Sequence, residues 1–140
     1  MDWHHITMTS FPSAEWFRSF AETLEADEEF RRAMSRFDGS IKLEVGDEVV
    51  WMKLYRGEVI EILGQEAEFG STFTVAGSTD QWMRLLTEDR NPFGEQQTLG
   101  KIEFRGDVLE ATRVTDGLNL LVEHLRAETP DTVDLGEAAQ

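Results

Sequence analysis

The stretch from Leu99 to Asp107, LGKIEFRGD, decides the fold of this chain. Within it, Ile102 and Phe104 alternate with charged residues, so they point to one face of a strand while the charges point to the other. Gly100 and Gly106 stand near its two ends, where glycine allows the backbone to turn sharply. Such a strand needs an apolar layer over one of its faces, and the flanking segments supply it.

Both flanking segments have the pattern of amphipathic helices. The upstream segment opens with a capping box, in which Ser78 is followed three residues later by Gln81. The predicted buried face of this helix carries Trp82, Leu85 and Leu86. The downstream segment repeats apolar residues at helical spacing, at Leu118, Leu121, Val122 and Leu125. Two helices and one strand must therefore share one interior.

The first half of the chain changes from helical to strand periodicity. Ser13 is expected to cap one helix with Trp16, Phe17, Phe20 and Leu24 on one face, and Asp27 a second with Phe30, Met34 and Phe37. Alternating segments then predict three antiparallel strands at 41–45, 49–55 and 59–63, and a fourth at 71–76. The segment 87–98 is expected to form a lid or a short irregular helix.

Length and charge limit the possible classes of protein. A chain of 140 residues fits one domain, assigned to residues 1–126, with an acidic tail at 127–140 that we expect to be disordered. The net charge of −15 repels nucleic acid and anionic membranes on average. No apolar run is long enough to span a bilayer, so no stable membrane insertion is expected. With no cysteine in the chain, we predict a cytoplasmic location.

The sequence offers little that would support catalysis. Its serines lack a nucleophile-elbow pattern, and its paired carboxylates are unremarkable in so acidic a chain. The adjacent His4 and His5 point in different directions, and His124 lies on the polar side of the last helix. We therefore predict no catalytic residues, no metal and no cofactor. An enzyme that uses carboxylates and His124 is the weakest of three hypotheses.

The order of several motifs resembles the sterol carrier protein-2 family. The residues that carry the resemblance are Phe73-Thr74-Val75, Gly77, Asp80, Trp82, Gly100-Lys101-Ile102 and Gly106-Asp107. The resemblance implies an elongated apolar tunnel between the sheet and the helices. We expect an α+β fold, with a five-stranded, mainly antiparallel sheet that two N-terminal helices, a short helix and a C-terminal helix cover.

The chain is rich in large apolar side chains, with four Trp, nine Phe and five Met. They can simply fill the core, or some can line a cavity for a fatty acid, an acyl chain or a sterol-like molecule. The predicted ligand-binding residues are Trp51, Met52, Phe73, Trp82, Met83, Leu86, Phe104, Leu121 and Leu125. The segment 87–98 or the last helix would gate entry. The alternative function is a dimerising or accessory interaction domain without a bound ligand, and a homodimer is one possible assembly.

Overall fold

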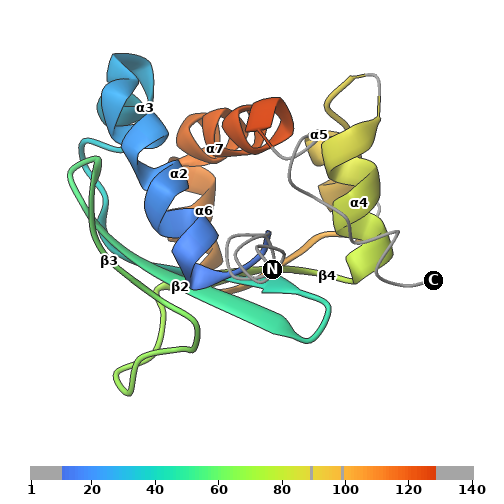
Figure 1. Cartoon of the computed structure of the whole chain (residues 1–140), viewed down its shortest axis with the longest axis horizontal. Coiled ribbons are helices and arrows are strands. Elements are labelled where there is room, and N and C mark those ends of the chain that lie inside the picture. The colour runs from blue at the N-terminus through green and yellow to red at the C-terminus, as the bar shows by residue number, and fades with distance from the viewer. Residues whose placement is uncertain (1–10, 89, 99, 129–140) are drawn as a thin grey trace, which may run out of the picture.

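In the computed structural model of the chain, helices cover one face of a five-stranded sheet (Figure 1). The structure describes residues 11–88, 90–98 and 100–128. The strands are β1 (Asp38–Val45), β2 (Glu48–Tyr55), β3 (Glu58–Leu63), β4 (Phe73–Gly77) and β5 (Glu103–Gly106). Their order is β3-β2-β1-β4-β5, and every neighbouring pair is antiparallel except β1 and β4. The predicted α+β class and mainly antiparallel sheet are confirmed.

Two capped helices precede the sheet, as predicted: α2 (Ala14–Ala26) and α3 (Glu28–Ala33). The Ser13 hydroxyl accepts a hydrogen bond from the Trp16 amide at 3.0 Å, and Asp27 accepts one from the Glu29 amide at 2.9 Å. Each cap satisfies an N–H group that the first helical turn leaves without a partner. Phe37, which was expected on the second helix, lies beyond the end of α3 and enters the core from the chain that leads into β1.

The first three strands form a meander with tight turns. In β1 and β2, Ile41 pairs with Met52, and Gly46 adopts a φ of +63° in the turn between them. Gly57, at φ +91°, turns β2 into β3, and a Cβ atom there would lie 2.8 Å from the Cα of Arg31. The second turn therefore packs directly against α3.

Strand β5 has the alternation of side chains that the LGKIEFRGD stretch predicts. It begins at Glu103, two residues after Lys101. Phe104 pairs with Val75 of β4, on the face toward the helices. The amides of Lys101 and Ile102 bond the carbonyl of Gln96, at 2.8 and 3.2 Å, instead of a neighbouring strand. Ile102 is nevertheless buried, so its predicted inward direction is correct.

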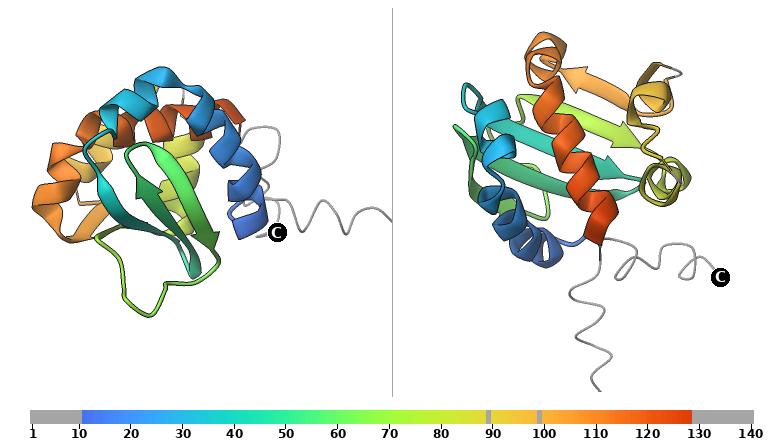
Figure 2. Two further views of the ribbon diagram at one scale, coloured as in Figure 1. Left: turned by 90° about the vertical axis from the view of Figure 1, so that its left-hand side faces the viewer. Right: turned by 90° about the horizontal axis from the view of Figure 1, so that it is seen from above.

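Four helices complete the covering layer: α4 (Thr79–Thr87), α5 (Phe93–Thr98), α6 (Val108–Arg113) and α7 (Thr115–Glu128). Helix α5 is the short helix that was one of two expectations for the segment 87–98. Helix α6 was not anticipated, although Asp107 caps it by accepting a hydrogen bond from the Glu110 amide at 3.0 Å. The right view of Figure 2 shows α7 crossing the sheet between α2 and α4.

The ends of the described chain bear on two expectations. Helix α7 continues to Glu128, two residues past the expected boundary at 126, and the rest of the predicted tail lies outside the described residues. His4 and His5 also lie outside them. Among the helices of the described ranges, none has the length and apolar character that crossing a bilayer requires.

Candidate functional site

A continuous apolar layer fills the space between the sheet and the helices. From the sheet it receives Ile41, Leu43, Val45, Val50, Met52, Leu54, Ile62, Phe73 and Val75. From the helices it receives mainly Phe17, Phe20, Leu24, Trp82, Leu85, Leu86, Leu118, Leu121 and Leu125. Because burying one large apolar side chain contributes about 1.5–3 kcal/mol, this layer is the main source of stability. It is also the part of the molecule best suited to an apolar ligand.

Seven of the nine predicted ligand-binding residues meet in this layer. They are Met52, Phe73, Trp82, Leu86, Phe104, Leu121 and Leu125, from β2, β4, α4, β5 and α7. The structure does not bring the other two to it. Met83 is half-buried on α4 and lies outside the apolar cluster. Trp51 lies on the opposite face of the sheet.

Alternation along β2 places Trp51 away from the helices. Its neighbour Met52 pairs with Ile41 on the covered face, whereas Trp51 pairs with Lys42 on the other face. The indole Nε1 donates to the carbonyl of Gly70 at 3.1 Å, and the ring of Phe69 packs edge-on at 5.5 Å. The chain between β3 and β4 therefore covers Trp51, which explains why β2 is apolar on both faces.

Trp82 connects the helix layer to the sheet. Its Nε1 donates to the carbonyl of Glu44 at 2.8 Å, and its side chain is 1% exposed. A Cβ atom on Gly77 would lie 3.2 Å from this Nε1 and 2.7 Å from the Cδ1 of Ile102. Glycine at position 77 thus allows both side chains to reach the end of β4.

Three phenylalanines form a row along β4, β5 and α5. The ring centroids of Phe73 and Phe104 are 6.3 Å apart, and those of Phe104 and Phe93 are 6.0 Å apart. Phe73 and Phe93 are buried, but Phe104 is only half-buried. Of the seven residues in the layer, Phe104 is therefore the one closest to solvent.

Polar contacts hold α4 to α7 above the apolar layer. The Arg126 guanidinium donates to the carbonyls of Leu85 and Glu88, the second at 2.5 Å. Asn91, which follows α4, donates through its amide to the carboxylate of Glu123 at 2.8 Å. These hydrogen bonds connect α7 to α4 and to the residues that follow α4.

The cavity expected between Trp82, Phe104 and α7 stays a prediction. Five surface depressions on the described part of the chain, of about 150 to 540 Å³, are lined by residues other than the nine predicted ones. The aromatic and aliphatic side chains of the layer are buried in one cluster.

The smallest of these depressions lies between α4 and α5. Its lining includes Gln81, Arg84, Gln96 and Lys101. The side-chain oxygens of Gln81 and Gln96 are buried and have no hydrogen-bond partner among the described residues. Because buried acceptors without partners cost free energy, the contact between α4 and α5 is less well satisfied than the rest of the interior.

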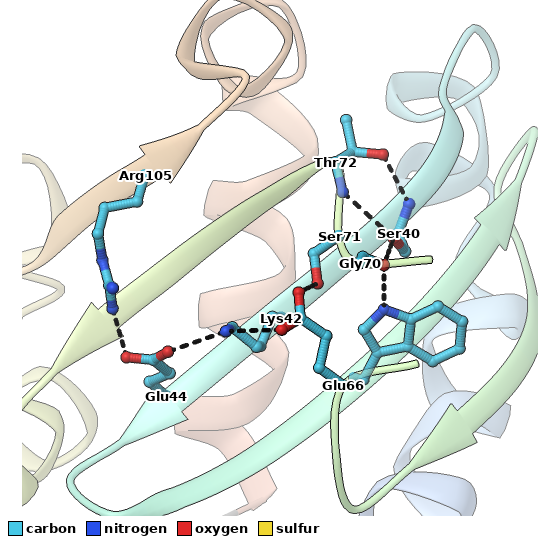
Figure 3. Close-up of polar contacts among 9 residues, drawn as sticks. Ser40, Lys42, Glu44, Glu66, Gly70, Ser71, Thr72 and Arg105 are labelled. Atoms are coloured by element: carbon cyan, nitrogen blue, oxygen red, sulfur yellow. Dashed lines mark hydrogen bonds and ion pairs between the residues drawn. The ribbon is translucent and has the colours of Figure 1, made fainter. Parts of the chain in front are cut away.

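A polar network that the sequence did not predict crosses the open face of the sheet (Figure 3). Lys42 lies between two carboxylates, 3.1 Å from Glu44 and 3.2 Å from Glu66. Arg105 of β5 pairs with the other oxygen of Glu44, and the Ser71 hydroxyl donates to Glu66 at 2.8 Å. The network ties β1, β5 and the segment before β4 together, so its role is structural.

The charges of this network support one another. Burial disfavours the charged forms of Lys42 and Glu44, but their hydrogen bonds outweigh burial. The pKa of Lys42 is therefore raised and the pKa of Glu44 is lowered. Hydrogen bonds from Ser71 and Lys42 lower the pKa of Glu66. All three groups are held in their charged forms.

His124 has a structural partner. Its Nε2 lies 2.7 Å from a carboxylate oxygen of Asp27, the residue that caps α3. The hydrogen bond with His124 is the main cause that lowers the pKa of Asp27. Among the described residues, no group of three or more His, Asp or Glu side chains could hold a metal ion.

No family model and no curated protein matches the sequence. Among solved structures, a crystal structure of sterol carrier protein 2 has a TM-score of 0.67 and 22% identity, and the match covers 79% of this chain and 93% of that one. A protein from Thermus thermophilus, described as possibly a sterol carrier protein, has a TM-score of 0.64 and 22% identity over 80% and 85% of the two chains.

A third similar structure belongs to a larger protein. A sec-alkyl sulfatase matches with a TM-score of 0.50 and 13% identity, over 73% of this chain and only 15% of the enzyme. The resemblance seen in the LGKIEFRGD region is thus confirmed as a likeness of fold: this chain has the α+β fold of sterol carrier protein 2.

Proposed function

We propose that this protein binds a lipid-like ligand, without catalysis, in the apolar layer between the sheet and the helices. The observation that carries the proposal is that seven predicted side chains from five separate elements converge in one apolar layer. Two of the solved structures with the same fold are described as sterol carrier proteins, one of them possibly so. Binding would draw on the burial of apolar ligand surface, at about 25 cal/mol per Å² before the costs of ordering.

Because the side chains of this layer are buried in one cluster, we expect a ligand to displace some of them when it binds. The most direct route is an outward movement of α4 and α5, which we name the gate segment, residues 79–98. Three polar contacts from two side chains, Arg126 and Asn91, hold this segment to α7 at its rim. We expect the gate segment to move more readily than the other helices that cover the layer. Within it, the side-chain oxygens of Gln81 and Gln96 have no hydrogen-bond partner among the described residues, and Phe104 beside it is only half-buried.

Lipid extraction tests the proposal directly. The purified protein is treated with organic solvent, and the extract is analysed by mass spectrometry beside an extract of an unrelated acidic protein purified in the same way. We expect a fatty acid, acyl lipid or sterol-like molecule in stoichiometric amount. An empty extract, together with no saturable uptake of a fluorescent fatty acid, would contradict the proposal.

The surroundings of two polar groups are consistent with the proposed non-catalytic role. His124 forms a hydrogen bond with Asp27, the residue that caps α3, and Lys42 forms ion pairs with two carboxylates. Neither arrangement presents a reactive group to the apolar layer. The absence of catalysis, of a metal and of a cofactor stays a prediction, as does the cytoplasmic location.

The second candidate is an accessory or dimerising domain. The similarity to a small part of a sec-alkyl sulfatase favours it, because there the fold is one portion of a larger chain. In the described part of the chain the helices cover one face of the sheet (Figure 1), and Lys42 and Arg105 lie on the other face. Size-exclusion chromatography with light scattering separates the two candidates: a stable dimer without lipid supports the second, and a lipid-loaded monomer supports the first.

A further inference from the structure

Two buried amide oxygens lie at the small depression between α4 and α5. The side-chain Oε1 atoms of Gln81, on α4, and Gln96, on α5, are buried, and neither has a hydrogen-bond partner among the described residues. Both residues line the same depression, of about 150 Å³, which we name the amide pocket. Because a buried acceptor without a partner costs free energy, two of them at one opening indicate a place for a hydrogen-bond donor.

The start of α4 leaves the Gln81 side chain available to such a donor. Ser78 and Gln81 have the spacing of a capping box, in which the second side chain also accepts from the backbone amide of the first residue. Only half of the box is formed, because the Gln81 amide donates to the Ser78 hydroxyl at 3.1 Å but the Gln81 Oε1 accepts no hydrogen bond from the described residues. The Gln81 side chain lines the amide pocket instead.

Gln96 is held at the amide pocket by its backbone. Its amide donates to the carbonyl of Pro92 at 2.8 Å, and its carbonyl accepts from the amides of Lys101 and Ile102 at 2.8 and 3.2 Å. The residue is only 6% exposed, although glutamine is mostly a surface residue. A glutamine held in this way keeps its amide oxygen at the pocket rather than in solvent.

The amide pocket adjoins the apolar layer. On α5, Phe93 precedes Gln96 by three residues, and on α4, Gln81 precedes Leu85 by four, so each glutamine has a buried apolar neighbour on the same side of its helix. The ring centroid of Phe93 in turn lies 6.0 Å from that of Phe104. A ligand whose apolar chain lies in the layer can therefore place its polar end at the amide pocket.

The charges around the amide pocket balance one another. Its lining carries two exposed cations and two exposed carboxylates, which are Arg84, Lys101, Glu88 and Glu95. A charged head would lose water in a site that has no net charge to offset the loss. A carboxylate is also a poor match for two amide oxygens, because it can only accept hydrogen bonds. The lining therefore favours an uncharged head that donates.

We infer that the amide pocket binds the hydroxyl head of an acyl lipid, such as a monoacylglycerol or a long-chain alcohol. The inference rests on the proposed function and names the class of ligand for that same site. The two hydroxyls of a monoacylglycerol supply one donor for each oxygen. The pocket has room for a head of several atoms, because one water needs only about 10–15 Å³. A fatty acid anion still binds through its chain, but less tightly.

Competition among ligands that share one chain and differ in their heads tests the inference. The full-length protein is loaded with a fluorescent fatty acid, which is then displaced at neutral pH by dodecanol, monododecanoylglycerol, methyl dodecanoate or dodecanoate. We expect the two hydroxyl lipids to act at concentrations about tenfold lower than the methyl ester, because one hydrogen bond to a buried acceptor that otherwise has no partner supplies about this factor. The carboxylate should compete no better than the ester.

Leucine in place of glutamine removes the acceptor and keeps a side chain of similar size. Gln96→Leu should reduce the preference for the hydroxyl lipids from about tenfold to about threefold or less, and Gln81→Leu/Gln96→Leu should reduce it to equal binding. The methyl ester should bind both variants at least as tightly as it binds the wild type. Both should unfold in urea at the wild-type midpoint or above it, because the lost oxygens had no partner among the described residues.

Gln65 offers a matched control for Gln96→Leu. It is exposed and lies on the chain between β3 and β4, which covers Trp51 on the opposite face of the sheet. Gln65→Leu makes the same chemical change away from the amide pocket, so its preference for the hydroxyl lipids should equal that of the wild type. A preference that survives in Gln81→Leu/Gln96→Leu, or that falls equally in Gln65→Leu, would overturn the inference.

The wild-type competition separates this inference from the proposed function. If all four ligands displace the fluorescent fatty acid at equal concentrations, the binding of lipid stands, the two amide oxygens bind water only, and the inference is overturned. If neither the fluorescent fatty acid nor any of the four ligands binds, the proposed function and the inference both fail. A preference for the hydroxyl lipids that depends on Gln81 and Gln96 supports both.

Discussion

Two helical glycines show how packing at a single residue sets its tolerance to change. A Cβ atom on Gly117 of α7 would lie 2.2 Å from the Sδ of Met34, a buried side chain that joins α3 to α7. A Cβ atom on Gly94 of α5 would have no atom within 4 Å. Glycine at position 117 therefore permits close packing, whereas glycine at position 94 has no such role.

The two sites predict opposite effects of the same substitution. Gly117→Ala should lower the free energy of unfolding by about 1–3 kcal/mol, because Met34 must shift in a filled interior. Gly94→Ala should raise it by about 0.5–1 kcal/mol, because alanine favours the helical conformation. Urea denaturation at neutral pH measures both. Equal effects of the two substitutions would show that Met34 is not in close contact with α7.

The lowered pKa of Asp27 predicts that the free energy of unfolding of the protein depends on pH. The hydrogen bond with His124 lowers the pKa of Asp27 in the folded protein. Its contribution is therefore complete above the usual aspartate pKa of about 3.9, and it is lost as the pH falls through the lowered value. Asp27→Asn keeps a good N-cap residue for α3 but removes the charge.

Urea denaturation of the wild type and of Asp27→Asn, at pH values from neutral to about 3, measures this effect. We expect the wild type to be more stable at neutral pH and the difference to narrow below the usual aspartate pKa. A difference that does not change with pH would mean that the charge of Asp27 contributes nothing. The other acids titrate in both proteins, so their effects cancel in the comparison.

At the scale of the elements, the gate segment differs from the helices on the other side of the molecule. Helices α2 and α3 insert Phe17, Phe20 and Phe30, with Met34 at the end of α3, into the core. The gate segment contributes Trp82, Leu85, Leu86 and Phe93, and it has two buried acceptors without partners. If one part of the helix layer moves to admit a ligand, this comparison favours the gate segment.

A chemical crosslink between two introduced cysteines tests this movement. Because the native chain has no cysteine, the crosslinker reacts only at the two introduced positions. The variant Asn91→Cys/Glu123→Cys, joined by a short bis-maleimide, ties the gate segment to α7, where the two native side chains lie 2.8 Å apart. Uptake of a fluorescent fatty acid should be lost when the crosslink precedes loading. The same variant without the crosslink should take up the fluorescent fatty acid as the wild type does.

The control for this experiment lies on the open face of the sheet. The variant Lys42→Cys/Glu66→Cys replaces a contact of 3.2 Å and, once crosslinked, leaves the gate segment free. Its uptake should equal that of its uncrosslinked form. If crosslinking at positions 91 and 123 leaves uptake intact, the ligand enters by another route.

At the scale of the whole molecule, the last helix predicts where the domain ends. Leu125 is fully buried, and Arg126 holds α4 through two carbonyls. We propose that the independently folded unit ends with α7 and that the acidic residues after it add no stability. Deleting residues 129–140 should leave the urea midpoint unchanged.

A deeper truncation gives the contrast. Deleting residues 123–140 removes Leu125 and Arg126, and it should lower the free energy of unfolding by more than about 3 kcal/mol, because a buried leucine and several hydrogen bonds are lost together. A loss of stability in the shorter deletion would instead show that the acidic residues pack on the folded domain.

Local pattern in the sequence determined the secondary structure and the directions of most side chains. Periodicity placed Trp82 and Leu86 on one face of a helix and Phe104 on the inner face of a strand, because both depend only on neighbours in the chain. The caps at Ser13, Asp27 and Ser78 were predicted for the same reason. The order of these elements was enough to suggest the fold.

Tertiary structure alone decided two other features. Met52 lies on the face of β2 that meets the helices, and Trp51 lies on the opposite face. The strands beside β2, rather than β2 itself, decide which of its faces meets the helices. Which large side chains meet in one buried cluster depends on how the sheet and the helix layer fit together.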